Sequence, residues 1–204
     1  MRTVTLDHLL ALLAFAIVTC FTPGPNNVML LASGLNFGFG RTIPHIIGVA
    51  VGFAIMVLLV GLGLAEAFER VPWLFRGLQA VGVGYLLWYA WSIASAGPIG
   101  DGRSSGRPLS LFEAALFQWV NPKGWMMALT ATATYVIAGR ARDSAMLIAI
   151  VFGLVGFSSA TTWALFGTTL SRVLREPATV RAFNIVMALL LVASLWPIVA
   201  DALK

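Results

Sequence analysis

Long apolar stretches alternate with short polar connections along the whole chain. Four of these stretches carry no charged residue, and each is about long enough to cross the hydrocarbon core of a bilayer as a helix, which takes ~20 residues. Two further apolar stretches are longer, but each is interrupted by residues that disfavour a helix. The charge-free stretches are 46–65, 78–96, 145–170 and 182–200, and the interrupted ones are 9–35 and 111–137.

The two interruptions are PGPNN at residues 23–27 and NPKG at residues 121–124. Split at these points, each stretch leaves fragments too short to span a bilayer, whereas the joined stretch crosses with length to spare. The pattern therefore predicts an all-α integral membrane protein, a single transmembrane domain over 1–204. It would have six transmembrane helices, with the first and the fourth broken.

Both interruptions fall in the first helix of a group of three. The polar segment 97–108, GPIGDGRSSGRP, divides the chain into halves of about 1–96 and 109–204. Because three spans is an odd number, the second half must enter the membrane from the opposite side. Paired broken segments at corresponding positions indicate the midplane binding site of a secondary transporter. We therefore predict two inverted three-helix repeats whose breaks face each other.

The composition supports a membrane protein and excludes other classes. Only 10% of the residues are charged, against roughly a quarter in soluble domains. The net charge of +5 comes from basic residues scattered singly through short loops, which is typical of membrane topology signals and not of a nucleic-acid groove. We expect the lipid bilayer and a small molecule as partners, and no nucleic acid. The sequence leaves the oligomeric state open, including a homo-oligomer.

Catalytic and metal-binding patterns are not found. Cys20 is the only cysteine, so the chain has neither an intramolecular disulfide nor a CxxC redox motif. It has no HExxH motif, and the spans hold no paired aspartates. We expect no enzyme activity, no cofactor and no metal site. The N-terminal apolar run lacks an A-x-A cleavage site, so we expect it to be retained as the first helix.

The first interruption should divide its helix into two. Pro25 has no N–H and disfavours helical geometry at the residue before it, and Pro23 acts in the same way. The chain should unwind over 22–25 and begin a new half-helix near Asn26. Asn26 or Asn27 could cap this half-helix, and its free N–H groups would then form a partial positive end that binds carboxylates. The alternative is a proline kink used only for packing.

Lys123 is the only basic residue in the interior of any predicted span, where a lysine costs about 3 kcal/mol or more. Glu113 lies ten residues earlier, near the membrane edge, so no acidic residue within the spans can neutralise this lysine. Three interpretations stay open. Lys123 could donate to backbone carbonyls freed by Pro122, it could pair with the carboxylate of a substrate, or it could carry a proton.

If Lys123 binds a substrate carboxylate, we expect its neighbours to take part in substrate recognition. Asn26 and Asn121 would orient the carboxylate, and the apolar side chains of Trp125 and Met126 would set specificity. Other residues with polar groups lie in predicted spans or at their ends. We expect His45 to be interfacial, with a proton relay as the alternative, and Asn184 to link helices, with substrate contact as the alternative. Asn36, Gln118 and Trp163 have the same two alternatives as Asn184.

The stretches TPGPNN and QWVNPKG, together with the Gly34–Gly40 region, resemble the lysine exporter (LysE/RhtB) family of amino-acid exporters. The likeness covers the whole chain, and it is greatest to the cysteine/O-acetylserine exporter branch. It implies export of amino acids or close derivatives across the bacterial inner membrane by proton or ion antiport. A transporter of lipids or other small anionic metabolites is the alternative, because a buried cation also suits a phosphate. The family motifs fall on Pro23, Gly24, Pro25, Asn26, Asn121, Pro122 and Lys123.

Overall fold

The computed structural model describes residues 5–64, 66, 70–96, 107–174, 176–196 and 200, so most of the predicted linker lies outside the described residues. Within these residues the regular structure is helical, without strands. The α-helices are joined by a π-helical turn, η1, and by a 3₁₀ turn, η2. The elements are α1 (Leu6–Phe21), α2 (Pro25–Phe37), α3 (Phe39–Leu59), η1 (Val60–Leu64), α5 (Pro72–Ala94), α6 (Leu111–Phe117), η2 (Gln118–Val120), α7 (Pro122–Tyr135), α8 (Ala141–Val173) and α9 (Pro177–Ala193).

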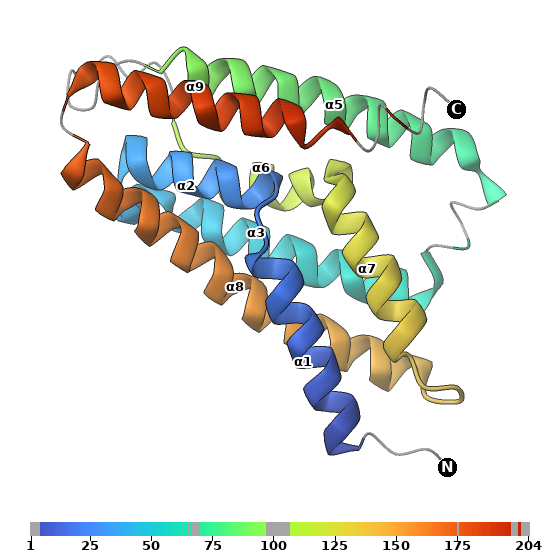
Figure 1. The fold of residues 1–204 in the computed structure, drawn as a ribbon. Helices are drawn as coiled ribbons and strands as arrows, with labels where there is room; N and C mark the ends of the chain where they lie inside the picture. Colours follow the sequence, from blue (N-terminus) through green and yellow to red (C-terminus); the bar gives the residue numbers. More distant parts are fainter. Residues whose placement is uncertain are drawn as a thin grey trace.

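The helices pack in layers (Figure 1). Helices α5 and α9 lie side by side and form one outer layer. Beneath them α2 and α3 pack along α8, and α3 also packs against α6. Helices α1 and α7 continue away from the α5–α9 layer toward the far end of α8. This arrangement brings the first half of the chain into contact with the second half along most of its length.

Several helices are long and apolar enough to cross a membrane. Two single helices qualify, Phe39–Leu64 (α3 with η1) and α8. A third span is obtained when α1 and α2 are taken together as one broken helix, bent by 55°. The described residues are therefore all-helical, as predicted, and have the helix lengths and apolar character of a membrane protein. The six-span inverted repeat stays a prediction.

The described part of each apolar stretch is mainly helical, but the bounds of helix and stretch differ. Helix α9, for example, ends at Ala193, although the predicted stretch continues to residue 200. Helix α3 begins at Phe39, seven residues before the predicted stretch, and Pro44 lies inside it. Helix α8 covers 33 residues, more than the apolar stretch that predicted it. The difference has a simple origin, since hydrophobicity marks the part of a helix in lipid and not the polar turns at its ends.

Glycines allow the closest helix contacts. A Cβ on Gly34 of α2 would lie 2.1 Å from the backbone oxygen of Ala164 in α8. A Cβ on Gly167 of α8 would lie 2.1 Å from the backbone oxygen of Leu31. Helices α2 and α8 therefore touch backbone to backbone, as small residues permit in membrane proteins. This contact fixes the position of α2, the helix that follows the first break.

Of the predictions for Asn184 and His45, one is confirmed and the other is wrong. Asn184 on α9 exchanges two amide hydrogen bonds with Asn36 on α2, at 3.1 and 3.2 Å, which confirms that it links helices. The prediction for His45 is wrong. Its side chain is fully buried, because α3 begins before Pro44 and carries this histidine into the protein interior instead of leaving it at a helix end.

Candidate functional site

The first break consists of three non-helical residues. Helix α1 ends at Phe21, and Thr22 and Gly24 have extended backbones. Pro25 occupies the first position of α2, where its missing N–H costs nothing. The unwound segment is thus residues 22–24, one residue shorter than predicted. The chain unwinds where the two prolines require it.

The predicted capping by Asn26 or Asn27 is wrong. Gly24 is the N-cap residue of α2, and no side chain caps that helix. Because α2 begins at Pro25, both asparagines lie within its first turn, beyond the capping position. The Asn27 side chain instead donates hydrogen bonds back to the carbonyl oxygens of Cys20 and Thr22, each at 2.9 Å. It therefore caps the carbonyl end of α1.

The second break is centred on Asn121. The 3₁₀ turn η2 ends there, Asn121 has an extended backbone, and Pro122 begins α7. The Asn121 side chain is 3% exposed. Its Oδ1 has no hydrogen-bond partner within the part of the chain that the structure describes. A buried acceptor without a donor costs about 1–3 kcal/mol, so this oxygen is a candidate to accept a hydrogen bond from a ligand.

A pair of amides joins the two breaks. Asn26 donates to Oε1 of Gln118 at 2.8 Å, and Gln118 donates to Oδ1 of Asn26 at 3.2 Å. Gln118 also donates to the Ala114 carbonyl oxygen at 2.8 Å, and its side chain is fully buried. Both amide groups are thereby held in fixed orientations. Gln118 was one of the polar residues with two possible roles in the sequence, and it was not predicted as a site residue.

Lys123 forms the second connection between the breaks. Its ammonium group donates to the carbonyl oxygen of Thr22 and lies 3.5 Å from that of Pro23. The lysine therefore does donate to freed carbonyls, but these belong to the first break and not to the one made by Pro122. Glu113 is engaged elsewhere, in a two-pronged ion pair with Arg107 at 2.6 Å.

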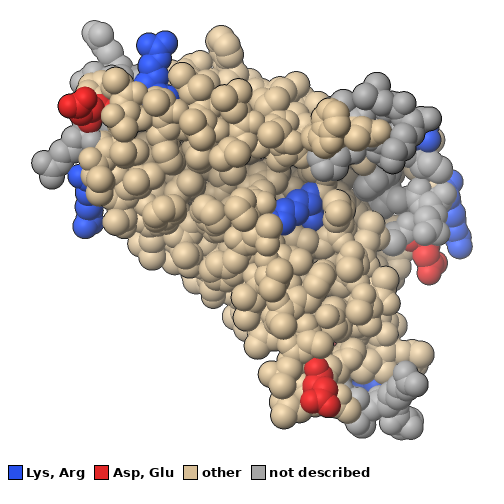
Figure 2. Space-filling view, viewed as in Figure 1, with Lys and Arg blue, Asp and Glu red and all other residues tan. Residues whose placement is uncertain are grey.

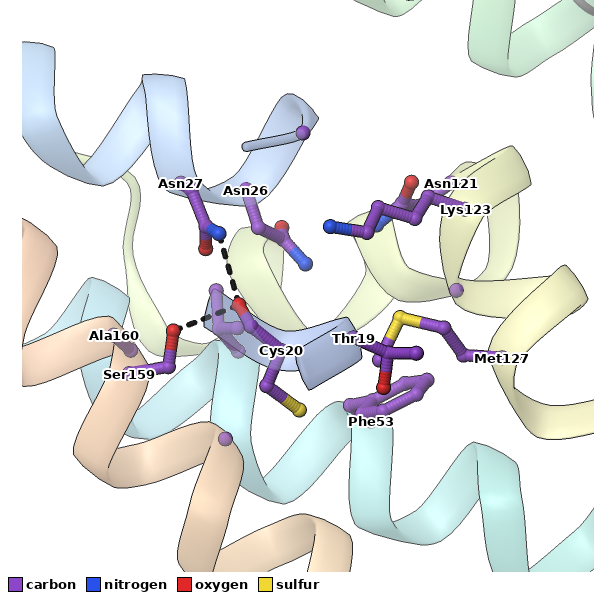
Figure 3. Close-up of a pocket in the computed structure, with 14 residues that line it drawn as sticks. Thr19, Cys20, Asn26, Asn27, Phe53, Asn121, Lys123, Met127, Ser159 and Ala160 are labelled. Carbon is purple, nitrogen blue, oxygen red and sulfur yellow. Dashed lines mark hydrogen bonds between the residues drawn. The ribbon is translucent and has the colours of Figure 1, made fainter. Parts of the chain in front are cut away.

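A pocket lies between the two breaks (Figure 3). It contains about 440 Å³ of space free of protein atoms, part of which is open to the outside. Lys123 extends from α7 toward Asn26, as the close-up shows. Phe53 and Met127 provide apolar walls. The pocket thus combines a cation and amide groups with an apolar lining.

The remaining wall comes from α8. Ser159 lines the pocket and donates a hydrogen bond at 2.8 Å to the Cys20 carbonyl oxygen, which also accepts from Asn27.

The prediction that Trp125 and Met126 form the apolar part of the site is wrong. Met126 is 64% exposed and Trp125 does not line the pocket. Since α7 starts at Pro122, its rotation turns Met127 inward and Met126 outward.

Apart from Trp125 and Met126, the structure gathers every predicted site residue at this place, in three kinds of position. Five residues line the pocket, one contributes a carbonyl oxygen to the lysine, and two begin the half-helices. The lining residues are Gly24, Asn26, Asn27, Asn121 and Lys123, the carbonyl is that of Pro23, and the half-helices begin at Pro25 and Pro122.

The surface around this site is apolar. Figure 2 shows charged side chains toward the ends of the molecule and a broad uncharged area between them. Basic side-chain atoms interrupt this area near its centre, close to where α1, α2 and α7 approach one another. The charge distribution fits a protein whose middle part lies in lipid.

A broken, apolar helical bundle with a polar pocket at its breaks is the architecture of a membrane transport protein. A family model for the LysE type translocator matches residues 17–194, and the chain belongs to this family of multi-pass membrane proteins of the bacterial inner membrane. Cysteine/O-acetylserine efflux proteins are 32% identical in Salmonella typhimurium and 31% identical in Escherichia coli, over 87% of this chain and 90% of each relative. The family resemblance inferred from the motifs is thus confirmed. No solved structure matches the chain.

Proposed function

We propose that this protein exports amino acids or close derivatives from the cytoplasm, and that the pocket between the two breaks is the substrate site. The observation that carries the proposal is the ammonium group of Lys123 beside a pocket without a carboxylate partner among the described residues. An amino-acid substrate brings its own carboxylate. The efflux of cysteine and O-acetylserine by the relatives makes small polar amino acids the first candidates.

In the proposed site, Lys123 pairs with the substrate carboxylate. The first turn of α2 adds backbone N–H groups at a helix N-terminus, which favour an anion. Asn26 and Asn121 orient the bound group, and Gln118 keeps Asn26 in place. Phe53 and Met127 contact the substrate side chain.

We further propose that the chain forms six spans as two inverted repeats. The helix contacts support this arrangement, because corresponding elements of the two halves meet each other. Helix α3 packs on α8, α5 packs on α9, and the first break contacts the second. In an inverted repeat a two-fold axis relates the two halves, and a helix close to this axis contacts the corresponding helix of the other half.

Transport would be driven by proton or ion antiport, with release once water reaches the ion pair from the outer side. The proposal makes the protein a carrier and not an enzyme, because the pocket offers recognition groups and no set of acid, base and nucleophile.

A resistance panel tests the proposal. Bacteria that overproduce the protein are challenged with toxic concentrations of individual amino acids and analogues, including cysteine and O-acetylserine. We expect resistance to a small group of related amino acids and lower amounts of them inside the cells. Lys123→Met is the matched control, since it keeps the approximate side-chain length. Equal resistance with Lys123→Met, or resistance to none of the compounds, would contradict the proposal.

A further inference from the structure

The ammonium group of Lys123 occupies a place that suits the amino group of a substrate. It donates to the Thr22 carbonyl oxygen and lies near that of Pro23. Both carbonyls follow the last residue of α1, at the negative end of the helix dipole, where cations are favoured. In a broken transmembrane helix such carbonyls commonly bind a cation. Here the cation is a side chain on a flexible stem.

A further acceptor belongs to Asn121, a residue that lines the same pocket. Oδ1 of Asn121 is buried and unpartnered within the described part of the chain. A carboxylate cannot satisfy it, because a carboxylate oxygen also accepts hydrogen bonds. A ligand that donates hydrogen bonds can. The pocket therefore suits a ligand that supplies a hydrogen-bond donor as well as an anionic group.

We propose that the α-ammonium group of the substrate displaces Lys123 from the Thr22 and Pro23 carbonyls, and that the released lysine then pairs with the substrate carboxylate. This inference rests on the proposed function and defines its substrate class more narrowly. The ligand must carry a free α-amino group and a free α-carboxylate together. Asn121 accepts a hydrogen bond from the incoming amino group.

Charge balance favours a zwitterion over its fragments. A zwitterion adds no net charge to the pocket, and each of its charged groups gains a partner. A carboxylate without an amino group would draw Lys123 away, so the Thr22 and Pro23 carbonyls would lose the ammonium group, and only Asn27 would still donate to Thr22. An amine without a carboxylate would place two cations side by side, and like charges a few ångströms apart repel each other.

Two isomeric ligands test this inference on the wild-type protein. O-acetyl-L-serine and N-acetyl-L-serine have the same atoms, but only the former has an ammonium group. Binding to the purified protein is measured by calorimetry in mildly acidic buffer, which prevents migration of the acetyl group. We expect the N-acetyl isomer to bind about tenfold more weakly or worse, because it offers no ammonium group to the Thr22 and Pro23 carbonyls or to the buried oxygen of Asn121. Equal binding of both isomers would overturn the inference but not the export of amino acids. Failure of the wild type to bind O-acetyl-L-serine would count against the proposed substrates themselves, and against this inference with them.

The variant Lys123→Met tests whether the substrate amino group displaces the lysine from the carbonyls or only binds beside it. This variant should bind O-acetyl-L-serine more weakly, since the carboxylate loses its partner. It should bind 2-aminoethyl acetate, the analogue without a carboxylate, several-fold more tightly than the wild type does, because no lysine competes for the carbonyls. A weaker or unchanged affinity for this amine would overturn the displacement. The melting temperature shows whether the variant is folded, and the isomer comparison needs no variant.

Discussion

Lys123 is held by backbone oxygens that belong to a different helix from its own. Its position depends on Gly24, because a Cβ there would lie 2.6 Å from Cδ of the lysine and 3.1 Å from Nζ. The backbone of Gly24 is extended, which any residue can adopt, so the lack of a side chain matters here only for space. The site therefore requires a glycine opposite the lysine.

Gly24→Ala should impair transport without removing any charge. The added methyl group would take up the space beside the Thr22 and Pro23 carbonyls in which the lysine or the substrate amino group binds, so we expect at least about tenfold weaker substrate binding, equivalent to ~1.4 kcal/mol. The melting temperature should change little, because the displaced group is the end of a flexible side chain. Gly84→Ala is the control, since no atom lies within 4 Å of a Cβ at that position. Unchanged transport by Gly24→Ala would show that the lysine position is not critical.

The amide pair of Asn26 and Gln118 should show strong coupling in a double-mutant cycle. Each single change to leucine leaves the other amide without this partner, which costs up to about 1–3 kcal/mol for the buried Gln118 and less for the half-buried Asn26. The double change removes both amides, so its loss in thermal stability should be smaller than the sum of the single losses. Melting temperatures in detergent measure this. Additive losses would mean that the two amides act independently and that Gln118 does not position Asn26.

At the scale of whole helices, the contact between α2 and α8 fixes the position of the first break. Gly34→Ala would bring a methyl group to 2.1 Å from the Ala164 backbone oxygen, so the two helices must separate. Overpacking of this kind costs about 1–3 kcal/mol, and we expect a lower melting temperature together with reduced transport. Gly156→Ala on α8 is the control for stability, because a Cβ there meets no atom within 4 Å. An equal melting temperature for both variants would contradict the close contact.

The sequence was sufficient to locate both breaks. Prolines lack an N–H and restrict the preceding residue wherever they occur, so PGPNN and NPKG mark the breaks without knowledge of the fold. Helix rotation was harder to predict. Whether Met126 or Met127 faces the pocket depends on the residue at which α7 begins, a difference of about 100° for each residue.

Contacts between distant segments were not predictable from local pattern. Ser159 lies 139 residues from Cys20, and nothing in its own helix indicates that it donates to that carbonyl. Gln118 lies three residues before Asn121, and this position next to NPKG was the one signal that could have identified it. Tertiary packing decides such pairs.

For the whole molecule, the contacts between corresponding helices bear on how the chain crosses the membrane. An inverted repeat puts the connection between the halves on the opposite side from both chain ends. The bias of basic residues toward the cytoplasm then gives the orientation. With the chain ends set aside, the basic residues on the side of the central connection are Arg41, Arg103, Arg107, Arg172, Arg175 and Arg181, and those on the other side are Arg70, Arg76, Arg140 and Arg142.

This six-to-four excess predicts that residues 97–108 face the cytoplasm and that Lys204 lies outside. Reporter fusions measure it, with alkaline phosphatase active only outside the cytoplasmic membrane and a fluorescent protein active only within the cytoplasm. We expect phosphatase activity from a fusion at Lys204 and fluorescence from a fusion within residues 97–108. The reverse result at both sites would keep the inverted repeat and correct only the orientation, which rests on a small difference in charge. The same reporter active at both sites would require an even number of crossings in the second half, and the inverted repeat would then be wrong.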